Sequence, residues 1–126
     1  MEPAKSHNRH ILSFKYAITG IMRALKEEPN LKFHFLAAAF VLTGGIILNI
    51  SIFDFIFIIF LAGFVISVEL TNTAIETVVD AFTDKEHPGA KLAKDISAGA
   101  VLIAAATSAV LGIIIFLPYI KNFLNG

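Results

Sequence analysis

The sequence predicts an all-α integral membrane protein, in which an N-terminal amphipathic surface helix precedes three transmembrane helices. Composition is the first observation, because 56% of the 126 residues are hydrophobic, more than an ordinary soluble domain carries. The second is the spacing of uncharged stretches at 35–53, 55–68 and 96–120. Each can supply most of the roughly 20 apolar residues that one membrane-spanning helix needs.

The surface helix is predicted at 9–27, where apolar residues recur at helical spacing on one face: Ile11, Phe14, Ile18, Ile21, Met22 and Leu25. Basic residues flank this face, as is typical of helices that lie in the membrane interface. Pro29 breaks this helix and can open the next one. The transmembrane helices are expected at about 31–50, 53–82 and 91–120, within a single domain over 1–126.

The distribution of charge predicts the orientation in the membrane. The N-terminal region carries lysine and arginine, and the second connection and its approach carry Lys85, Lys91 and Lys94, whereas the connection between the first two spans has no basic residue. Because basic loops stay on the cytoplasmic side, both basic regions should face the cytoplasm. The formal net charge is 0, so no basic excess supports nucleic-acid binding. The absence of cysteine excludes thiolate metal sites and cysteine nucleophiles.

A stripe of polar residues on the second transmembrane helix is the informative chemical feature. Glu69, Asn72, Glu76 and Asp80 fall within an arc of roughly 80° on one helical face. Carboxylates are costly near lipid, and like charges one turn apart repel, so a cation should lie against the stripe. Glu69 should lie near the cytoplasmic boundary, about 24 Å along the helix axis. Glu76 should lie about 10 Å further along, in water.

Other charged residues should converge at the same membrane level. Glu28 ends the surface helix, and Lys91, Lys94 and Asp95 begin the last helix. Glu28 and Glu76 can together hold Mg²⁺, a lysine can neutralise phosphate, and Glu69 can accept the proton of an attacking hydroxyl. This combination suits phosphoryl transfer. The sequence has no P-loop and no kinase glycine loop, so ATP would bind in an unusual arrangement.

Several alternatives remain open from the residues alone. Glu69 can be a structural partner of Lys94, and Lys91 and Lys94 can simply set topology. Glu28 can be a solvated charge beside Pro29, and His87 can be a turn residue. At the level of the whole protein, intramembrane carboxylates also occur in channels and carriers. A noncatalytic assembly subunit is the third possibility, because small residues share a face of the last helix: Ala98, Ala105, Ala109 and Gly112.

Two motifs resemble a known family. Glu69-x-x-Asn72-Thr73-Ala74-Ile75-Glu76-x-x-Val79-Asp80 and His87-Pro88-x-Ala90-Lys91-x-Ala93-Lys94-Asp95-x-x-Ala98-Gly99-Ala100-Val101 are similar to the prokaryotic diacylglycerol kinase family. The resemblance implies a homotrimer in the bacterial cell membrane, with composite active sites on the cytoplasmic side. It also implies ATP as the phosphoryl donor, Mg²⁺ as the cofactor and a lipid alcohol as the substrate.

The resemblance assigns roles to individual residues. Glu69 would be the catalytic base, Glu28 and Glu76 would bind the metal with the nucleotide, and Asn72 and Asp80 would support the site. The remaining nucleotide contacts would be Arg9, Tyr16, Glu86, His87, Lys94 and Asp95. The His-Pro-Gly-Ala-Lys segment and Ala98 are more similar to the Gram-positive branch, whose members resemble undecaprenol kinases. Undecaprenol is therefore the expected substrate, with diacylglycerol as the alternative.

Overall fold

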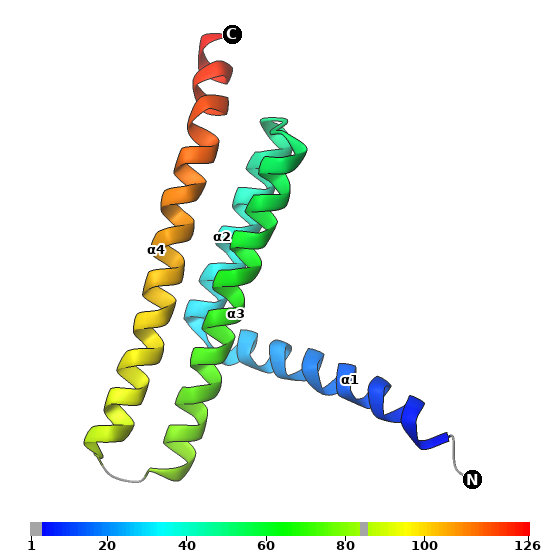
Figure 1. Cartoon of the computed structure of the whole chain (residues 1–126), viewed down its shortest axis with the longest axis vertical. Helices are drawn as coiled ribbons and strands as arrows, with labels where there is room; N and C mark the ends of the chain where they lie inside the picture. The colour runs from blue at the N-terminus through cyan, green and yellow to red at the C-terminus, as the bar shows by residue number, and fades with distance from the viewer. Residues whose placement is uncertain (1–3, 84–85) are drawn as a thin grey trace.

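The computed structural model describes the backbone of residues 4–83 and 86–126 and the side chains of residues 12–83 and 86–126. These residues form four helices in the order α1 (Ala4–Glu27), α2 (Pro29–Ile47), α3 (Ile52–Phe82) and α4 (Pro88–Asn125). The described part contains no strand. Figure 1 shows α2, α3 and α4 side by side in a bundle, from which α1 projects.

The first two helices are separated by a single residue. Glu28 has an extended backbone (φ −104°, ψ 111°), and Pro29 occupies the first turn of α2, where its missing N–H costs nothing. α2 ends at Ile47, before the predicted limit of 50. Asn49 adopts a positive φ of 49°, a left-handed conformation that asparagine tolerates and that a helix cannot continue through. The chain then turns within four residues into α3.

α4 is longer at both ends than the predicted 91–120. It begins at Pro88, because the His87 side chain caps its first turn. It continues through Pro118 to Asn125, although proline removes one backbone hydrogen bond. Transmembrane helices tolerate such a loss because neighbouring groups satisfy the freed carbonyl. α1 likewise begins at Ala4, five residues before the predicted start at residue 9.

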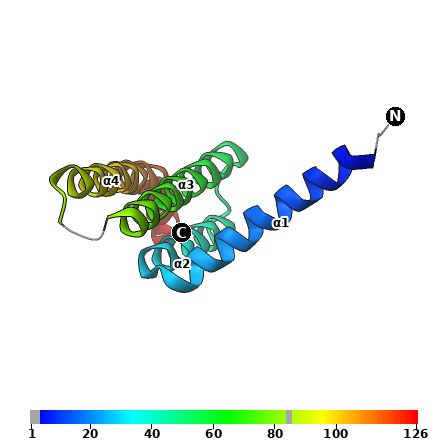
Figure 2. The same ribbon diagram turned by 90° about the horizontal axis from the view of Figure 1, so that it is seen from below.

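α3 is the central helix of the bundle and packs against both α2 and α4, as Figure 2 also shows. Near one end, Ile50, Ile58 and Leu61 form a buried cluster with partly buried residues from α2 and α4 around it. Gly45 allows α2 to approach this cluster closely. A Cβ atom at Gly45 would lie 3.0 Å from Ile50 Cδ1, tighter than ordinary packing.

α1 lies outside the bundle and exposes its apolar face. It contacts α2 and α3, and in Figures 1 and 2 it runs away from the side where α3 connects to α4. Phe14 and Ile18 are 73% and 60% exposed. An exposed apolar face on a basic helix has a natural partner in the membrane interface.

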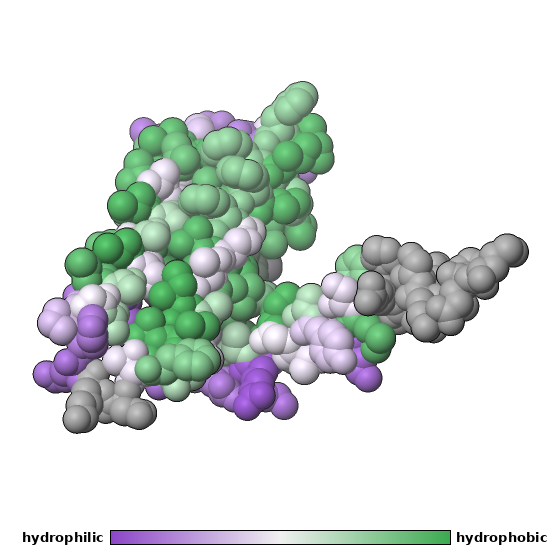
Figure 3. Space-filling model, turned by 60° about the horizontal axis from the view of Figure 1, so that its bottom comes forward, coloured by the Kyte–Doolittle hydropathy of each residue, from purple (hydrophilic) through white to green (hydrophobic). Residues whose placement is uncertain are grey.

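The surface of the bundle is apolar along most of its length. Phe40 and Phe53 are each 81% exposed, and Figure 3 shows hydrophobic residues covering the visible side, with polar residues toward the ends. α2, α3 and α4 are each long and apolar enough to cross a membrane. The prediction of an all-α integral membrane fold with one surface helix and three spans is therefore confirmed, while the homotrimer and the single domain stay predictions.

Candidate active site

The polar stripe of α3 runs from a buried end to an exposed one. Glu69 is only 2% exposed and Asn72 only 7% exposed, although both lie on a helix with an apolar exterior. Glu76 is partly buried and Asp80 is exposed. The stripe therefore runs from a position buried within the bundle to the solvent-exposed end of the bundle. A lipid headgroup and a soluble molecule can meet along it.

Glu28 and Glu76 both influence Glu69 electrostatically at the buried end of the stripe, and we call Glu28, Glu69 and Glu76 the acidic cluster. His34 of α2 also acts electrostatically on Glu69. The Glu28 side chain makes no capping hydrogen bond to α2. Among the described side chains, no lysine or arginine forms an ion pair with the cluster. A cation added here would relieve repulsion between like charges.

Lys94 of α4 provides the cation that the stripe requires, at the exposed end of the stripe. Lys94 Nζ donates hydrogen bonds to both carboxylate oxygens of Asp80, at 2.9 and 3.1 Å. Glu69 is not the partner of Lys94, so the alternative of a Glu69–Lys94 pair is wrong. Asp80 holds Lys94 at the wet end of the stripe, and an ammonium group has a third N–H available for another acceptor.

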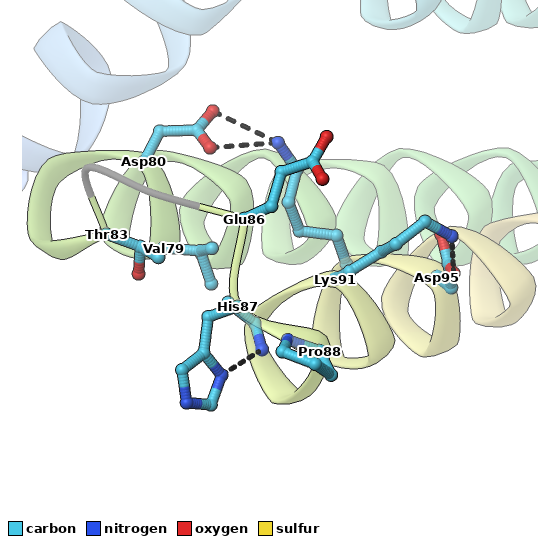
Figure 4. A pocket seen from close by; sticks show the side chains of 10 residues that line it. Val79, Asp80, Thr83, Glu86, His87, Pro88, Lys91 and Asp95 are labelled. Carbon is cyan, nitrogen blue, oxygen red and sulfur yellow. Dashed lines mark hydrogen bonds and ion pairs between the residues drawn. The ribbon is translucent and has the colours of Figure 1, made fainter.

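A pocket of about 640 Å³ lies beside this ion pair, where α3 ends and α4 begins. Its lining includes five residues expected at the site: Asp80, Glu86, His87, Lys94 and Asp95. In Figure 4 the Asp80 and Glu86 carboxylates lie on one side of the α3–α4 connection, and the His87 ring lies on the other. The pocket thus brings together two segments that the sequence separates.

His87 and Asp95 already have structural partners in this pocket. His87 Nδ1 accepts hydrogen bonds from the backbone N–H groups of Gly89 (3.1 Å) and Ala90 (3.4 Å). This cap leaves Nε2 as the ring nitrogen that can contact a ligand. Asp95 accepts a hydrogen bond from Lys91 at 2.9 Å, one turn earlier on α4. This i,i+4 pair is exposed, so its members can exchange partners at small cost.

Two of the expected nucleotide residues lie on α1. Tyr16 is 70% exposed and does not line the pocket. Arg9 lies in α1, but its side chain is outside the described residues. Because α1 extends away from the α3–α4 connection (Figure 1), this chain does not bring Tyr16 to its own pocket.

Two polar residues at the site were not among the site residues expected from the sequence. Ser97 of α4 is buried, and its hydroxyl donates a hydrogen bond to Asn72 Oδ1 at 2.6 Å. His34 is partly buried near Glu69. Ser97 is three residues after Lys94 on the same helix, so a helical projection from the lysine could have identified it. His34 carried no comparable local signal.

Metal binding can be tested against the donor groups present. The described residues contain no group of three His, Cys, Asp or Glu side chains that could hold a metal ion by themselves. Glu28 and Glu76 nevertheless offer hard oxygen donors, and both act electrostatically on Glu69. Mg²⁺ in phosphoryl-transfer sites commonly uses one or two carboxylates and takes its other ligands from phosphates and water. The residues therefore fit Mg²⁺ bound together with a nucleotide.

Comparisons with known proteins agree with this chemistry. Residues 15–116 match the family model described as prokaryotic diacylglycerol kinase. The chain is 47% identical over 111 residues to the undecaprenol kinase of Bacillus subtilis, covering 88% of this chain and 90% of that protein. It is 34% identical over 109 residues to a diacylglycerol kinase of Synechocystis, covering 86% and 62%. A diacylglycerol kinase of Haemophilus influenzae is 31% identical over 94 residues, covering 75% and 80%.

The matched region contains α2, α3, most of α4, the acidic cluster and the pocket. The expected family is confirmed, and with it the interpretation of the chain as a lipid kinase. This protein belongs to the prokaryotic diacylglycerol kinase family.

Proposed function

We propose that this chain transfers the γ-phosphoryl group of ATP to the hydroxyl of undecaprenol, with Mg²⁺, to make undecaprenyl phosphate. The observation that carries this proposal is the burial of Glu69 at the polar end of an apolar bundle, beside Glu28 and Glu76. The name of the Bacillus subtilis relative, together with its 47% identity, supports undecaprenol as the lipid.

Glu69 is suited to the role of general base. Its carboxylate would take the proton from the lipid hydroxyl while that oxygen attacks the γ-phosphorus of ATP. The bond between the γ-phosphorus and its bridging oxygen would break, and ADP would leave. A proton acceptor at the boundary between lipid and water suits this reaction, because the hydroxyl must stay near its tail in the membrane.

The other residues would bind and neutralise the phosphates. Lys94, oriented by Asp80, can donate its third N–H to a phosphate oxygen. Glu28 and Glu76 would hold Mg²⁺, whose chemistry is to neutralise charge on the phosphate oxygens. Glu86, His87 and Asp95 line the same pocket and would contact the rest of the nucleotide.

A homotrimer with shared sites would explain the position of α1. Tyr16 and Arg9 are expected to contact the nucleotide, yet α1 extends away from the pocket of its own chain (Figure 2). In a symmetric oligomer, one subunit can supply α1 to the pocket of its neighbour. The basic N-terminal region, and the α3–α4 connection together with the lysines that begin α4, would both face the cytoplasm, where ATP is available.

Diacylglycerol is the second candidate substrate, because the Synechocystis and Haemophilus influenzae relatives carry that name. The channel and assembly-subunit interpretations have no comparable support in these matches. The purified chain in detergent should be assayed with radiolabelled ATP and Mg²⁺ against undecaprenol and diacylglycerol side by side. We expect faster phosphorylation of undecaprenol. Faster phosphorylation of diacylglycerol would make diacylglycerol the preferred substrate in place of undecaprenol. The absence of any lipid phosphate product would refute both candidates.

A further inference from the structure

Ser97 lies where α4 packs against the polar stripe of α3. It is 7% exposed, and its Oγ lies 2.6 Å from Asn72 Oδ1 and 3.0 Å from the backbone oxygen of Lys94. Both of those oxygens are acceptors, and a hydroxyl has one proton to donate. The shorter contact identifies Asn72 as the main acceptor.

The bond from Ser97 determines which way the Asn72 amide faces. Asn72 Oδ1 is directed to Ser97. Asn72 Nδ2 therefore faces the next turn of α3, where it donates a hydrogen bond to Glu76 Oε1 at 3.4 Å. The reverse orientation would bring the Asn72 carbonyl against the Glu76 carboxylate, two acceptors without a proton between them. Ser97 and Glu76 therefore favour the same orientation of one buried amide.

We propose that Ser97 is a positioning residue, which acts through the Asn72 amide to orient the Glu76 carboxylate toward a metal-bound nucleotide. This inference rests on the proposed function, because that function assigns Glu76 to Mg²⁺. Hydrogen bonds to a ligating carboxylate commonly tune metal affinity. The 3.4 Å bond to Glu76 is long, so the fixed amide guides the carboxylate without competing strongly for its lone pairs.

The same turn of α4 supports the assignment. Lys94 and Ser97 are three residues apart and lie on one helical face. Each makes a side-chain hydrogen bond to α3, Lys94 to Asp80 and Ser97 to Asn72. α4 thus fixes both the lysine at the wet end of the stripe and the amide between Glu69 and Glu76.

Ser97→Ala tests the proposal, with Ser108→Ala as the matched control. Ser108 lies on the same helix, and its buried hydroxyl has no hydrogen-bond partner among the side chains that the structure describes. Binding of Mn²⁺, as a substitute for Mg²⁺, is measured by electron paramagnetic resonance on the whole protein in detergent with a nonhydrolysable ATP analogue. We expect Ser97→Ala to weaken Mn²⁺ binding about 10-fold, with an unchanged KM for undecaprenol. Ser108→Ala should bind Mn²⁺ like the unmodified chain.

A second pair of variants separates positioning from general packing. If Ser97 acts through Asn72, Ser97→Ala should weaken Mn²⁺ binding no further in an Asn72→Ala background. An additive loss there, or unchanged binding in Ser97→Ala alone, would overturn the positioning role. Failure of the unmodified chain to phosphorylate any lipid would instead refute the proposed function, so the two failures are distinguishable.

Discussion

Lys94 of α4 donates to both carboxylate oxygens of Asp80 on α3, at 2.9 and 3.1 Å, and both residues line the pocket. The lysine and aspartate side chains are 35% and 66% exposed. Such exposed pairs contribute little to stability, because water screens the two charges. The bond is therefore better suited to hold the ammonium group in place than to stabilise the fold.

Lys94→Gln should raise the KM for ATP with little effect on thermal unfolding. Loss of a charged hydrogen bond to phosphate costs about 1.5–3 kcal/mol, which corresponds to about tenfold or more in affinity. Asp80→Asn should have a smaller effect, because it loosens the lysine without removing it. Steady-state kinetics at varied ATP would measure both. Arg23→Gln is the control, because Arg23 pairs with Glu27 on exposed α1. An unchanged KM for ATP in Lys94→Gln would contradict the assignment.

Glu69→Gln should lower kcat by about 10²- to 10⁴-fold, the usual contribution of a general base. Glutamine has nearly the same shape but cannot accept the hydroxyl proton. Binding of a nonhydrolysable ATP analogue should remain, because Glu28, Glu76 and Lys94 are unchanged. Glu27→Gln provides the control, since Glu27 is exposed and paired with Arg23. Normal turnover of lipid by Glu69→Gln would remove Glu69 from the proposed chemistry.

The features that the sequence predicted correctly are those encoded within single helices. Uncharged runs located the three spans, and helical periodicity placed Glu69 and Asn72 on one face. Helix limits were less accurate, because they depend on individual caps. The His87 side chain starts α4 at Pro88, and the positive φ of Asn49 stops α2 at Ile47.

Contacts between helices could not be predicted in the same way. The partner of Lys94 depends on how α4 is rotated and shifted along α3. Neither the rotation nor the shift can be derived from the residue pattern of a single helix. The same holds for Ser97, whose partner is 25 residues away. Serine is common in transmembrane helices, where it often bonds to its own backbone, as Ser67 does to Gly63. A helical projection places Ser97 on the face of Lys94, but its hydrogen-bond partner Asn72 is seen only with both helices in place.

A second polar cluster, at the opposite end of the bundle, also joins segments that are distant in sequence. Tyr119 Oη donates to Asp54 Oδ2 at 2.5 Å, and Ser51 Oγ donates to the same oxygen at 2.8 Å. The Ser51 backbone N–H in turn donates to Tyr119 Oη at 3.1 Å. These bonds tie the far end of α4 to the α2–α3 connection. Asp54 lies 15 residues before Glu69, about 22 Å along α3.

Tyr119→Phe should therefore destabilise the protein without impairing catalysis. A hydrogen bond to a charged group stabilises a fold more than a neutral one, and phenylalanine keeps the ring while removing the hydroxyl. The Tyr119→Phe protein should therefore unfold at a lower temperature in mixed detergent micelles, whereas kcat measured well below the unfolding temperature should stay the same. Phe123→Leu, which changes an exposed ring one turn later, should shift unfolding much less. Equal stability of Tyr119→Phe and the unmodified chain would show that the cluster does not hold α4 to the rest of the bundle.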